Sequence, residues 1–277
     1  MRHLHRTTAV ITGAANGIGR ATADALADRG ASLALIDIDD AGLHNLQRTL
    51  GASFPDIAIS THRCDVSDRR AMADTAGAIL DEHGAVDIVI NNAGINVTAP
   101  FEDHDHDAFE RVMDVNFWGV VHGCQLFLPH LKDRPWGHLV NISSAFGIVG
   151  VASQSAYSAS KFAVRGFSES LHEELANTSV DVSVVHPGCI ATSIIDAAHI
   201  ADDHSRDAIA TFFRDHGHPP EAVARRIVDA IARRTHRVVV TPEARLLDWL
   251  RRLAPTLGNR LANRLMQRFT DVDLFDD

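Results

Sequence analysis

The sequence has few cysteines, little excess positive charge and no long apolar run. Its three cysteines, Cys64, Cys124 and Cys189, form no CxxC pair, so neither a disulfide framework nor a zinc site is expected. The formal net charge of −10 argues against a nucleic-acid-binding protein, because phosphate contacts need a positive surface. No run approaches the roughly 18 apolar residues of a membrane-spanning helix. Since no apolar signal core precedes the first expected strand, we expect a cytoplasmic protein.

Histidine is frequent, with 17 residues, but its arrangement does not predict a metal site. Most histidines lie in polar stretches, as His104 and His106 do. Residues two apart do not share a helix face, and the HExxH pattern is absent. We therefore expect solvated surface histidines and no bound metal.

Short apolar runs rich in Val and Ile alternate with longer stretches of helical periodicity. The expected strands are Thr8–Thr12, Ser32–Ile38, Ala58–Cys64, Val86–Asn91, His138–Ile142, Asp181–Val185 and Arg237–Val240. The expected helices are Gly17–Arg29, Ala41–Leu50, Asp68–Glu82, His106–Leu131, Ser155–Asn177 and Pro220–Arg233. Apolar strands that alternate with helices predict a parallel sheet covered on both faces. Right-handed crossovers then give a doubly wound, Rossmann-type α/β sheet of about seven strands.

We expect one domain over residues 1–242, followed by a helical extension over residues 243–277. Residues 193–218 fall outside the alternation of strands and helices; this segment is long, polar and rich in histidine, and it follows a Pro-Gly turn. The extension is rich in arginine and carries apolar residues at helical spacing, namely Leu246, Leu247, Trp249, Leu250 and Leu253. Such an amphipathic helix can pack on its own domain or on a partner subunit, or lie on a membrane surface.

The stretch TGAANGIG, Thr12–Gly19, follows the first strand and opens the first helix. Gly13 permits the tight turn, Gly17 lets the backbone approach a pyrophosphate, and Gly19 lets the helix pack closely on the sheet. The helix N-terminus presents N–H groups and a partial positive charge to the phosphates. An ordinary turn can carry similar glycines, but the position between strand and helix predicts a dinucleotide site.

Asp37 ends the second strand, 18 residues past Gly19. A carboxylate at this point accepts hydrogen bonds from the ribose hydroxyls of NAD and repels the extra phosphate of NADP. No basic residue follows directly, and Asp39 and Asp40 can cap the next helix instead. Arg20 is the alternative partner for an extra phosphate. The balance of charge favours NAD over NADP.

Tyr157 and Lys161 lie four residues apart in YSASK, on one face of the expected helix. A nearby ammonium favours the phenolate, so we expect Lys161 to lower the pKa of Tyr157 from about 10. In isolation such a pair is usually a solvated helix face. Ser144 lies 13 residues earlier, where the fifth strand ends, and ligands of open α/β sheets bind beyond strand ends. The serine hydroxyl is therefore expected beside the pair, although Ser143 and Ser144 also suit a simple turn.

Several motifs occur in order along the chain, namely TGAANGIG, NNAG (Asn91–Gly94), Asn116, Ser144, YSASK and Pro187–Gly188. Together they resemble the short-chain dehydrogenase/reductase family over about residues 7–242. The resemblance implies an NAD-dependent enzyme that transfers a hydride between the coenzyme and a secondary alcohol or ketone. It also implies a homodimer or homotetramer.

The resemblance implies a role for each matching residue. Tyr157 would exchange a proton with the substrate oxygen, Lys161 would lower its pKa and hold the nicotinamide ribose, and Ser144 would orient the substrate. Asn116 would anchor a water relay to Lys161. Coenzyme contacts are implied at Gly13, Asn16, Gly17, Ile18, Gly19, Asp37, Asp65, Val66, Asn92, Gly94, Tyr157, Lys161, Ile190 and Thr192. Asp65 would meet the adenine, whereas taken alone it is more typical of a helix cap.

The residues around the substrate are expected to be apolar. The resemblance implies that residues 193–218 form a helical lid over the substrate. This lid offers Ile194, Ile195, Ile200, Ile209, Phe212 and Phe213, and the opposite wall offers Ile95, Val97, Phe146, Ile148 and Val149. A mainly apolar ketone or secondary alcohol fits such a pocket. Among rival functions, an epimerase or dehydratase has a different glycine pattern and a larger substrate domain. A non-catalytic NAD-binding sensor or scaffold is the other alternative, and such proteins usually lack the tyrosine or the lysine.

Overall fold

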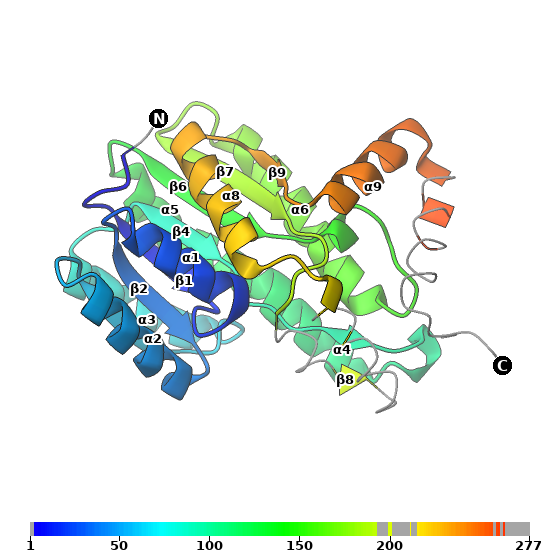
Figure 1. Ribbon diagram of the computed structural model, residues 1–277, viewed down its shortest axis with the longest axis horizontal. Helices are drawn as coiled ribbons and strands as arrows, with labels where there is room; N and C mark the ends of the chain where they lie inside the picture. The colour runs from blue at the N-terminus through cyan, green and yellow to red at the C-terminus, as the bar shows by residue number, and fades with distance from the viewer. Residues whose placement is uncertain are drawn as a thin grey trace.

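The computed structural model describes residues 3–192, 199–200, 211, 215–256, 259–260 and 263. Seven parallel strands form its central sheet, namely β1 (Thr8–Thr12), β2 (Ser32–Asp37), β3 (Ile59–Arg63), β4 (Ile88–Asn91), β6 (Gly137–Ile142), β7 (Val180–His186) and β9 (Arg237–Val239). Their order across the sheet is β3-β2-β1-β4-β6-β7-β9 (Figure 1). This arrangement confirms the doubly wound α/β fold expected from the sequence.

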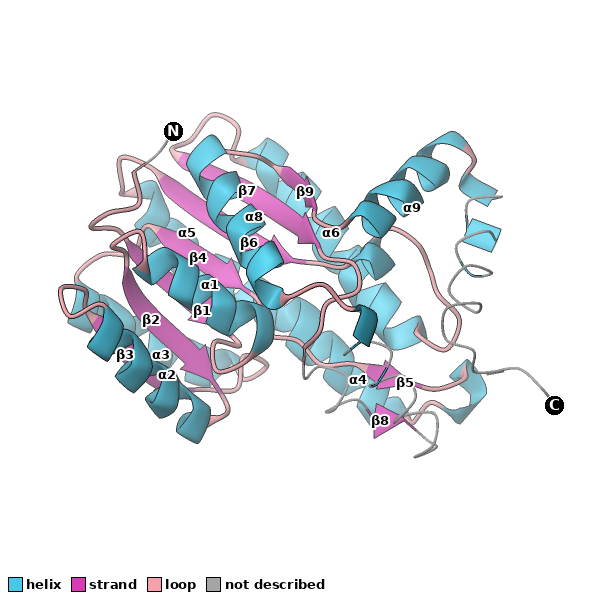
Figure 2. Cartoon of the chain, in the orientation of Figure 1, coloured by secondary structure: helices cyan, strands magenta, loops and turns pink. Residues whose placement is uncertain are grey.

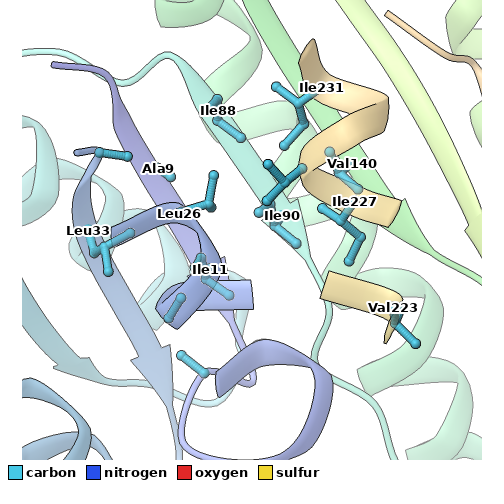
Figure 3. Close-up of a cluster of buried hydrophobic side chains, with 14 of the residues drawn as sticks. Ala9, Ile11, Leu26, Leu33, Ile88, Ile90, Val140, Val223, Ile227 and Ile231 are labelled. Atoms are coloured by element: carbon cyan, nitrogen blue, oxygen red, sulfur yellow. The ribbon is translucent and has the colours of Figure 1, made fainter. Parts of the chain in front are cut away.

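Helices cover both faces of the sheet because consecutive strand residues point to opposite sides. Ala9 and Ile11 point toward α1 (Gly17–Ala27), α2 (Asp40–Ser53) and α8 (Pro220–Arg233), whereas Val10 points toward α3 (Arg69–His83), α5 (Gly119–Lys132) and α6 (Ser155–Glu174). Figure 3 shows the first of these two cores, in which Leu26 of α1 and Ile227 of α8 lie over β1 and β4. Burial of the apolar strand side chains on both faces stabilises the sheet.

The expected helix His106–Leu131 is divided in the structure. It consists of α4 (His106–Met113), a π-helical turn η2 (Asp114–Trp118) and α5. The wider turn surrounds Asn116, which is fully buried and bonds to the backbone of Ile95. A single helical period in the sequence gives no sign of such a turn, and π-turns of this kind are frequent at functional sites.

Two short strands and two 3₁₀ turns were not expected from the sequence. β5 (Val97–Thr98) pairs in parallel with β8 (His199–Ile200), which lies in the expected lid. The turns are η1 (Phe101–Asp103) and η3 (Ala145–Gly147). Apart from β8, residue 211 and residues 215–218, the expected lid at 193–218 lies outside the described residues.

The beginning of the expected C-terminal extension forms α9 (Pro242–Leu253). Figure 2 shows α9 projecting from the body of the molecule after β9. Thr241 caps its N-terminus by accepting a hydrogen bond from the N–H of Ala244. Most of the chain beyond residue 256 is outside the described part. Within the described ranges, no helix combines the length and apolar character that a membrane crossing requires.

The position of the site follows from the strand order. β1 lies between β2 and β4, so the chain winds outward in one direction from β1 to β3 and in the other from β4 to β9. Ligands of such sheets bind in the crevice that opens at this reversal, outside the carboxyl ends of the strands.

Candidate active site

A cavity of about 750 Å³ lies at the carboxyl ends of the strands. Its lining contains most of the residues that the sequence predicts for the site, namely Gly13, Asn16, Gly17, Ile18, Asp37, Asp65, Val66, Asn92, Gly94, Ser144, Tyr157, Lys161, Ile190 and Thr192. Two predicted residues, Gly19 and Asn116, are not part of the lining. The fold therefore brings together residues that are up to 179 positions apart, from Gly13 to Thr192.

The glycine loop has the conformation that its sequence requires. Gly13 has a φ of +63°, and a Cβ atom there would lie 2.8 Å from the Cα atom of Ala93. A Cβ atom on Gly19 would overlap the carbonyl oxygen of Gly13, so Gly19 permits close packing of α1 without lining the cavity. Asn16 precedes α1 and makes no side-chain capping bond. The first-turn N–H groups of α1 are therefore not occupied by that side chain.

The Asp37 carboxylate is oriented by two backbone groups. Its Oδ2 atom accepts from the N–H of Ala15 at 2.9 Å, and its Oδ1 atom accepts from the N–H of Asp39 at 3.0 Å. Each oxygen keeps further acceptor capacity for a ligand hydroxyl. Arg20, the alternative phosphate partner, does not line the cavity.

Asp65 is held by an ion pair that the sequence does not reveal. Its Oδ2 atom accepts from Arg111 at 2.7 Å, and its Oδ1 atom accepts from Ser67 at 2.7 Å. Burial acts to raise the pKa of Asp65, but its hydrogen bonds with Ser67 and Arg111 hold it below the usual range. Arg111 lies on α4, 46 residues away, and also lines the cavity. No local pattern connects these two positions.

Asn92 and Asn116 have their side chains bonded to the protein itself. Asn92 donates from Nδ2 to the carbonyls of Thr12 at 3.0 Å and Gly13 at 3.1 Å, which joins the ends of β1 and β4. Asn116 accepts from the N–H of Ile95 at 2.8 Å and donates to its carbonyl at 2.9 Å. These bonds make both asparagines part of the framework around the cavity.

Tyr157, Ser144 and Lys161 lie together at one part of the cavity. Tyr157 is in the first turn of α6 and hydrogen-bonds with the Ser144 side chain. The Nζ atom of Lys161 lies 5.6 Å from the centre of the Tyr157 ring and donates to the carbonyl of Ile142 at 3.0 Å. The ring of Phe146 packs edge-on against Tyr157, with centroids 6.1 Å apart. Ser143 instead donates to the backbone carbonyl of Lys161 at 2.8 Å.

The pKa of Tyr157 differs from the sequence expectation and is a correction to it. Burial raises the pKa of Tyr157 to about 12, although the hydrogen bond from Ser144 acts to lower it. Burial also lowers the pKa of Lys161 from 10.5 to about 8. The ammonium does not overcome the burial of the phenol, because Lys161 is directed at the Ile142 carbonyl and is itself disfavoured as a cation.

The walls near Tyr157 are partly those expected from the sequence. Ile95 and Phe146 line the cavity, but Val97, Ile148 and Val149 do not and belong to separate apolar clusters. Sequence reasoning missed other lining residues, namely Ile38, Asn96, Arg111, Cys189, His216, His218, Glu243, Leu246 and Leu247. Several of these come from α9 and from the segment before α8, whose approach to the cavity depends on tertiary structure.

The described residues contain no group of three or more His, Cys, Asp or Glu arranged to hold a metal ion. All three cysteines are free thiols. Burial raises the pKa of Cys124 to about 12, and the same effect together with the charge of Glu243 raises that of Cys189 to about 12.

Sequence comparisons relate this chain to short-chain dehydrogenases and other oxidoreductases. The model of the short chain dehydrogenase family matches residues 7–202. A Mycobacterium tuberculosis protein named "Putative oxidoreductase SadH" is 42% identical over 268 residues, which cover 94% of this chain and 95% of that protein. The bovine (Bos taurus) dehydrogenase/reductase SDR family member 7B is 35% identical over 94% of this chain and 81% of its own length.

A solved structure agrees with these sequence relationships. A short-chain dehydrogenase/reductase from Burkholderia phymatum, in complex with NAD, superimposes with a TM-score of 0.86 at 29% identity. The match covers 93% of this chain and 96% of the other.

Proposed function

Because the chain belongs to the short-chain dehydrogenase/reductase family, we propose that it is an oxidoreductase that moves a hydride between NAD and a secondary alcohol or ketone. The observation that carries this proposal is the convergence of Ser144, Tyr157 and Lys161 on the cavity that the glycine loop and Asp37 also line. A proton-transfer group and the residues suited to a dinucleotide thus line the same cavity.

The residues present fit a dinucleotide. The N–H groups at the start of α1 suit a pyrophosphate, and the preceding Asn16 side chain does not occupy them. Asp37 would bind the adenosine ribose hydroxyls and repel an additional phosphate, which supports NAD over NADP. Ile190 and Thr192 line the same cavity and are proposed nicotinamide contacts. When bound, the nicotinamide supplies or accepts the hydride.

Tyr157 is the proposed acid/base. In reduction, the Tyr157 hydroxyl donates its proton to the substrate oxygen as the carbonyl carbon gains a hydride. In oxidation, the Tyr157 phenolate takes the alcohol proton as that carbon loses the hydride. Ser144, which hydrogen-bonds with the phenol, orients the substrate oxygen, and the Lys161 ammonium supports the phenolate and the ribose. Buried Asn116 holds the loop at Ile95 and is the proposed end of a water relay.

The substrate is proposed to be mainly apolar. Ile95, Phe146, Leu246 and Leu247 line the cavity, and such walls favour apolar groups around a few polar anchors. The function of residues 193–218 as a lid stays a proposal, since most of that segment lies outside the described residues.

We further propose that the chain forms a homodimer or homotetramer. Trp118 beside α5 and Phe162 on α6 are 48% and 36% exposed, and aromatic side chains are enriched at protein–protein interfaces. On α9, three side chains of one face are also exposed, namely Leu246, Trp249 and Leu253. That face suits a partner subunit or other protein contact, with a membrane surface as the alternative.

The three free cysteines suit a reducing cytoplasm.

A panel of secondary alcohols and ketones assayed with both coenzymes tests the proposed reaction. We expect formation or loss of reduced-coenzyme absorbance with at least one apolar member, faster with NAD than with NADP. Coenzyme binding without turnover across the panel would favour the sensor or scaffold.

Sedimentation and vesicle flotation of the Trp249→Ser variant beside the wild type distinguish oligomer contact from membrane binding by α9.

A further inference from the structure

The first turn of α9 packs directly against the turn that follows β7. An ideal Cβ atom on Gly188 would lie 2.5 Å from the Oε1 atom of Glu243 and would overlap the Thr241 hydroxyl. Gly188 therefore leaves the space that the Glu243 carboxylate occupies. Pro187, Gly188 and Glu243 all line the cavity of the proposed site.

Glu243 uses both carboxylate oxygens outside its own helix. Its Oε1 atom accepts from the N–H of Cys189 at 3.2 Å, and its Oε2 atom lies 3.3 Å from the Nε2 atom of His218. Burial acts to raise the pKa of Glu243, but hydrogen bonds with Thr241 and Cys189 and the nearby His218 hold it below its usual value. The carboxylate is therefore anionic at neutral pH and can accept both contacts.

His218 joins the same loop through its backbone. Its N–H donates to the carbonyl of Cys189 at 2.9 Å, and its carbonyl accepts from the N–H of Ala191 at 3.0 Å. This pairing forms a parallel bridge between Ile190 and His218. The backbone of His218 thus pairs with that of residues 189–191. The Glu243 carboxylate contacts both members of this pair, at the Cys189 N–H and at the His218 ring.

These contacts are not needed to begin α9. Thr241 already caps the helix, and the Glu243 side chain is 44% exposed, so its burial contributes little to folding. An acidic residue in a first helical turn is favourable in any case. What sets Glu243 apart is that its two oxygens bond two separate segments, and both of these segments line the cavity.

We infer that Glu243 is a positioning residue, which fixes the loop carrying Ile190 and Thr192 and so makes the C-terminal extension part of the coenzyme site. The inference rests on the proposed function, because the coenzyme contacts of Ile190 and Thr192 are themselves proposed. The hydrogen bonds of the Glu243 carboxylate to other segments go to Cys189 and His218, and not to Tyr157 or Ser144, which act on the substrate. Its loss is therefore expected to weaken coenzyme binding more than it lowers kcat.

Two variants with a matched control test this inference. In Glu243→Ala the Cys189 N–H loses its acceptor and His218 its partner, whereas in Glu243→Gln an amide oxygen can still accept from Cys189. Glu110→Gln is the control, because Glu110 also pairs with a histidine, His106 at 3.4 Å, in an exposed position and is not part of the cavity lining. The readouts are the Kd for NADH, kcat at saturating coenzyme, and amide hydrogen exchange of Cys189 and Ala191.

We expect Glu243→Ala to raise the Kd for NADH by about tenfold, as loss of a charge-assisted hydrogen bond does, and to speed exchange of the two amides. The expected rise for Glu243→Gln is less than about threefold, and Glu110→Gln should match the wild type. Unaltered Kd and exchange in Glu243→Ala would overturn the inference, as would a loss confined to kcat.

The amide exchange needs no coenzyme and separates the two proposals. If the wild type does not bind NADH, the proposed function fails while the exchange still reports on the loop. If Glu243→Ala does not fold, Glu243→Ser carries the test, because its short side chain reaches neither the Cys189 N–H nor the His218 ring. The same rise in Kd and faster exchange are expected, and an unaltered Kd and exchange in Glu243→Ser would overturn the inference.

Discussion

Lys161 holds its Nζ atom 5.6 Å from the centre of the Tyr157 ring. This separation places the two groups in one site, and the hydrogen bond of the Lys161 ammonium goes to the Ile142 carbonyl. Burial raises the pKa of the phenol to about 12 and lowers that of the lysine to about 8, so burial favours the neutral form of each. A cationic nicotinamide at this site would favour the phenolate, which makes the coenzyme part of the proton chemistry.

Tyr157 is the only tyrosine in the chain, so the absorbance of its phenolate reports its pKa directly. In protein without added coenzyme we expect a titration midpoint near 12, and a lower midpoint when NAD⁺ saturates the site. Circular dichroism at each pH shows whether the fold persists, and Tyr157→Phe is the blank. A midpoint at or below about 10 in the folded protein alone would contradict the effect of burial.

The same pKa predicts different pH dependences for the two directions of the reaction. Reduction uses the protonated phenol, which predominates at all pH values below about 12, so its rate should vary little across the neutral range. Oxidation uses the phenolate, so kcat/KM should rise with pH, by about tenfold per unit at most, up to about pH 8, where Lys161 begins to lose its ammonium. Initial rates in both directions over one pH series check this, and an oxidation rate that falls with pH below about 8 argues against it.

Lys161→Met should stabilise the fold while it impairs turnover. The folded pKa of Lys161 lies below its ordinary 10.5, so the unfolded chain binds more protons between pH 8 and 10.5 and wild-type stability rises with pH there. Below that window the cost of the buried ammonium is present in full, about 3 kcal/mol. At pH 7 we therefore expect a higher Tm and turnover lower by about a hundredfold or more.

Lys132→Met is the control for this prediction, because Lys132 is exposed at the end of α5. It should alter neither Tm nor turnover appreciably. A lower Tm for Lys161→Met at pH 7 would show that the hydrogen bond to Ile142 outweighs the cost of burying the charge.

Asp37→Ala should reduce the preference for NAD. The substitution removes the negative charge at the end of β2 and the acceptor for the N–H groups of Ala15 and Asp39. We expect the ratio of kcat/KM for NAD to that for NADP to fall by at least about tenfold. Asp40→Ala, a neighbouring carboxylate outside the cavity lining, should leave the ratio as in the wild type. An unchanged ratio in Asp37→Ala would remove Asp37 from the determinants of coenzyme choice.

The strands were predictable because their apolar character comes from burial on both faces. β1 and β6 lie within one residue of the expected bounds, as continuous Val, Ile and Leu runs in a doubly covered sheet should. The π-turn around Asn116 was not predictable. It depends on hydrogen bonds with Ile95, 21 residues away, and the local sequence keeps an ordinary helical period.

The site, like the fold, has parts that the sequence predicts and parts that depend on tertiary structure. The motifs place Gly13, Asp37, Ser144 and Tyr157 at strand ends or helix starts, and parallel topology brings those ends to one edge. Glu243 reaches the edge only because α9 returns after β9, which no spacing reveals. The pKa of Tyr157 depends on desolvation by the whole fold, so the helical spacing of Lys161 alone predicted the wrong direction.

The most direct test of the central claim compares Tyr157→Phe with the wild type in turnover and in NADH binding. Loss of the hydroxyl removes the proton donor and acceptor but keeps the ring that packs against Phe146. We predict that turnover falls by about a hundredfold or more, while the Kd for NADH stays close to that of the wild type. Wild-type turnover in the folded, NADH-binding variant would contradict the assignment of Tyr157 as the acid/base.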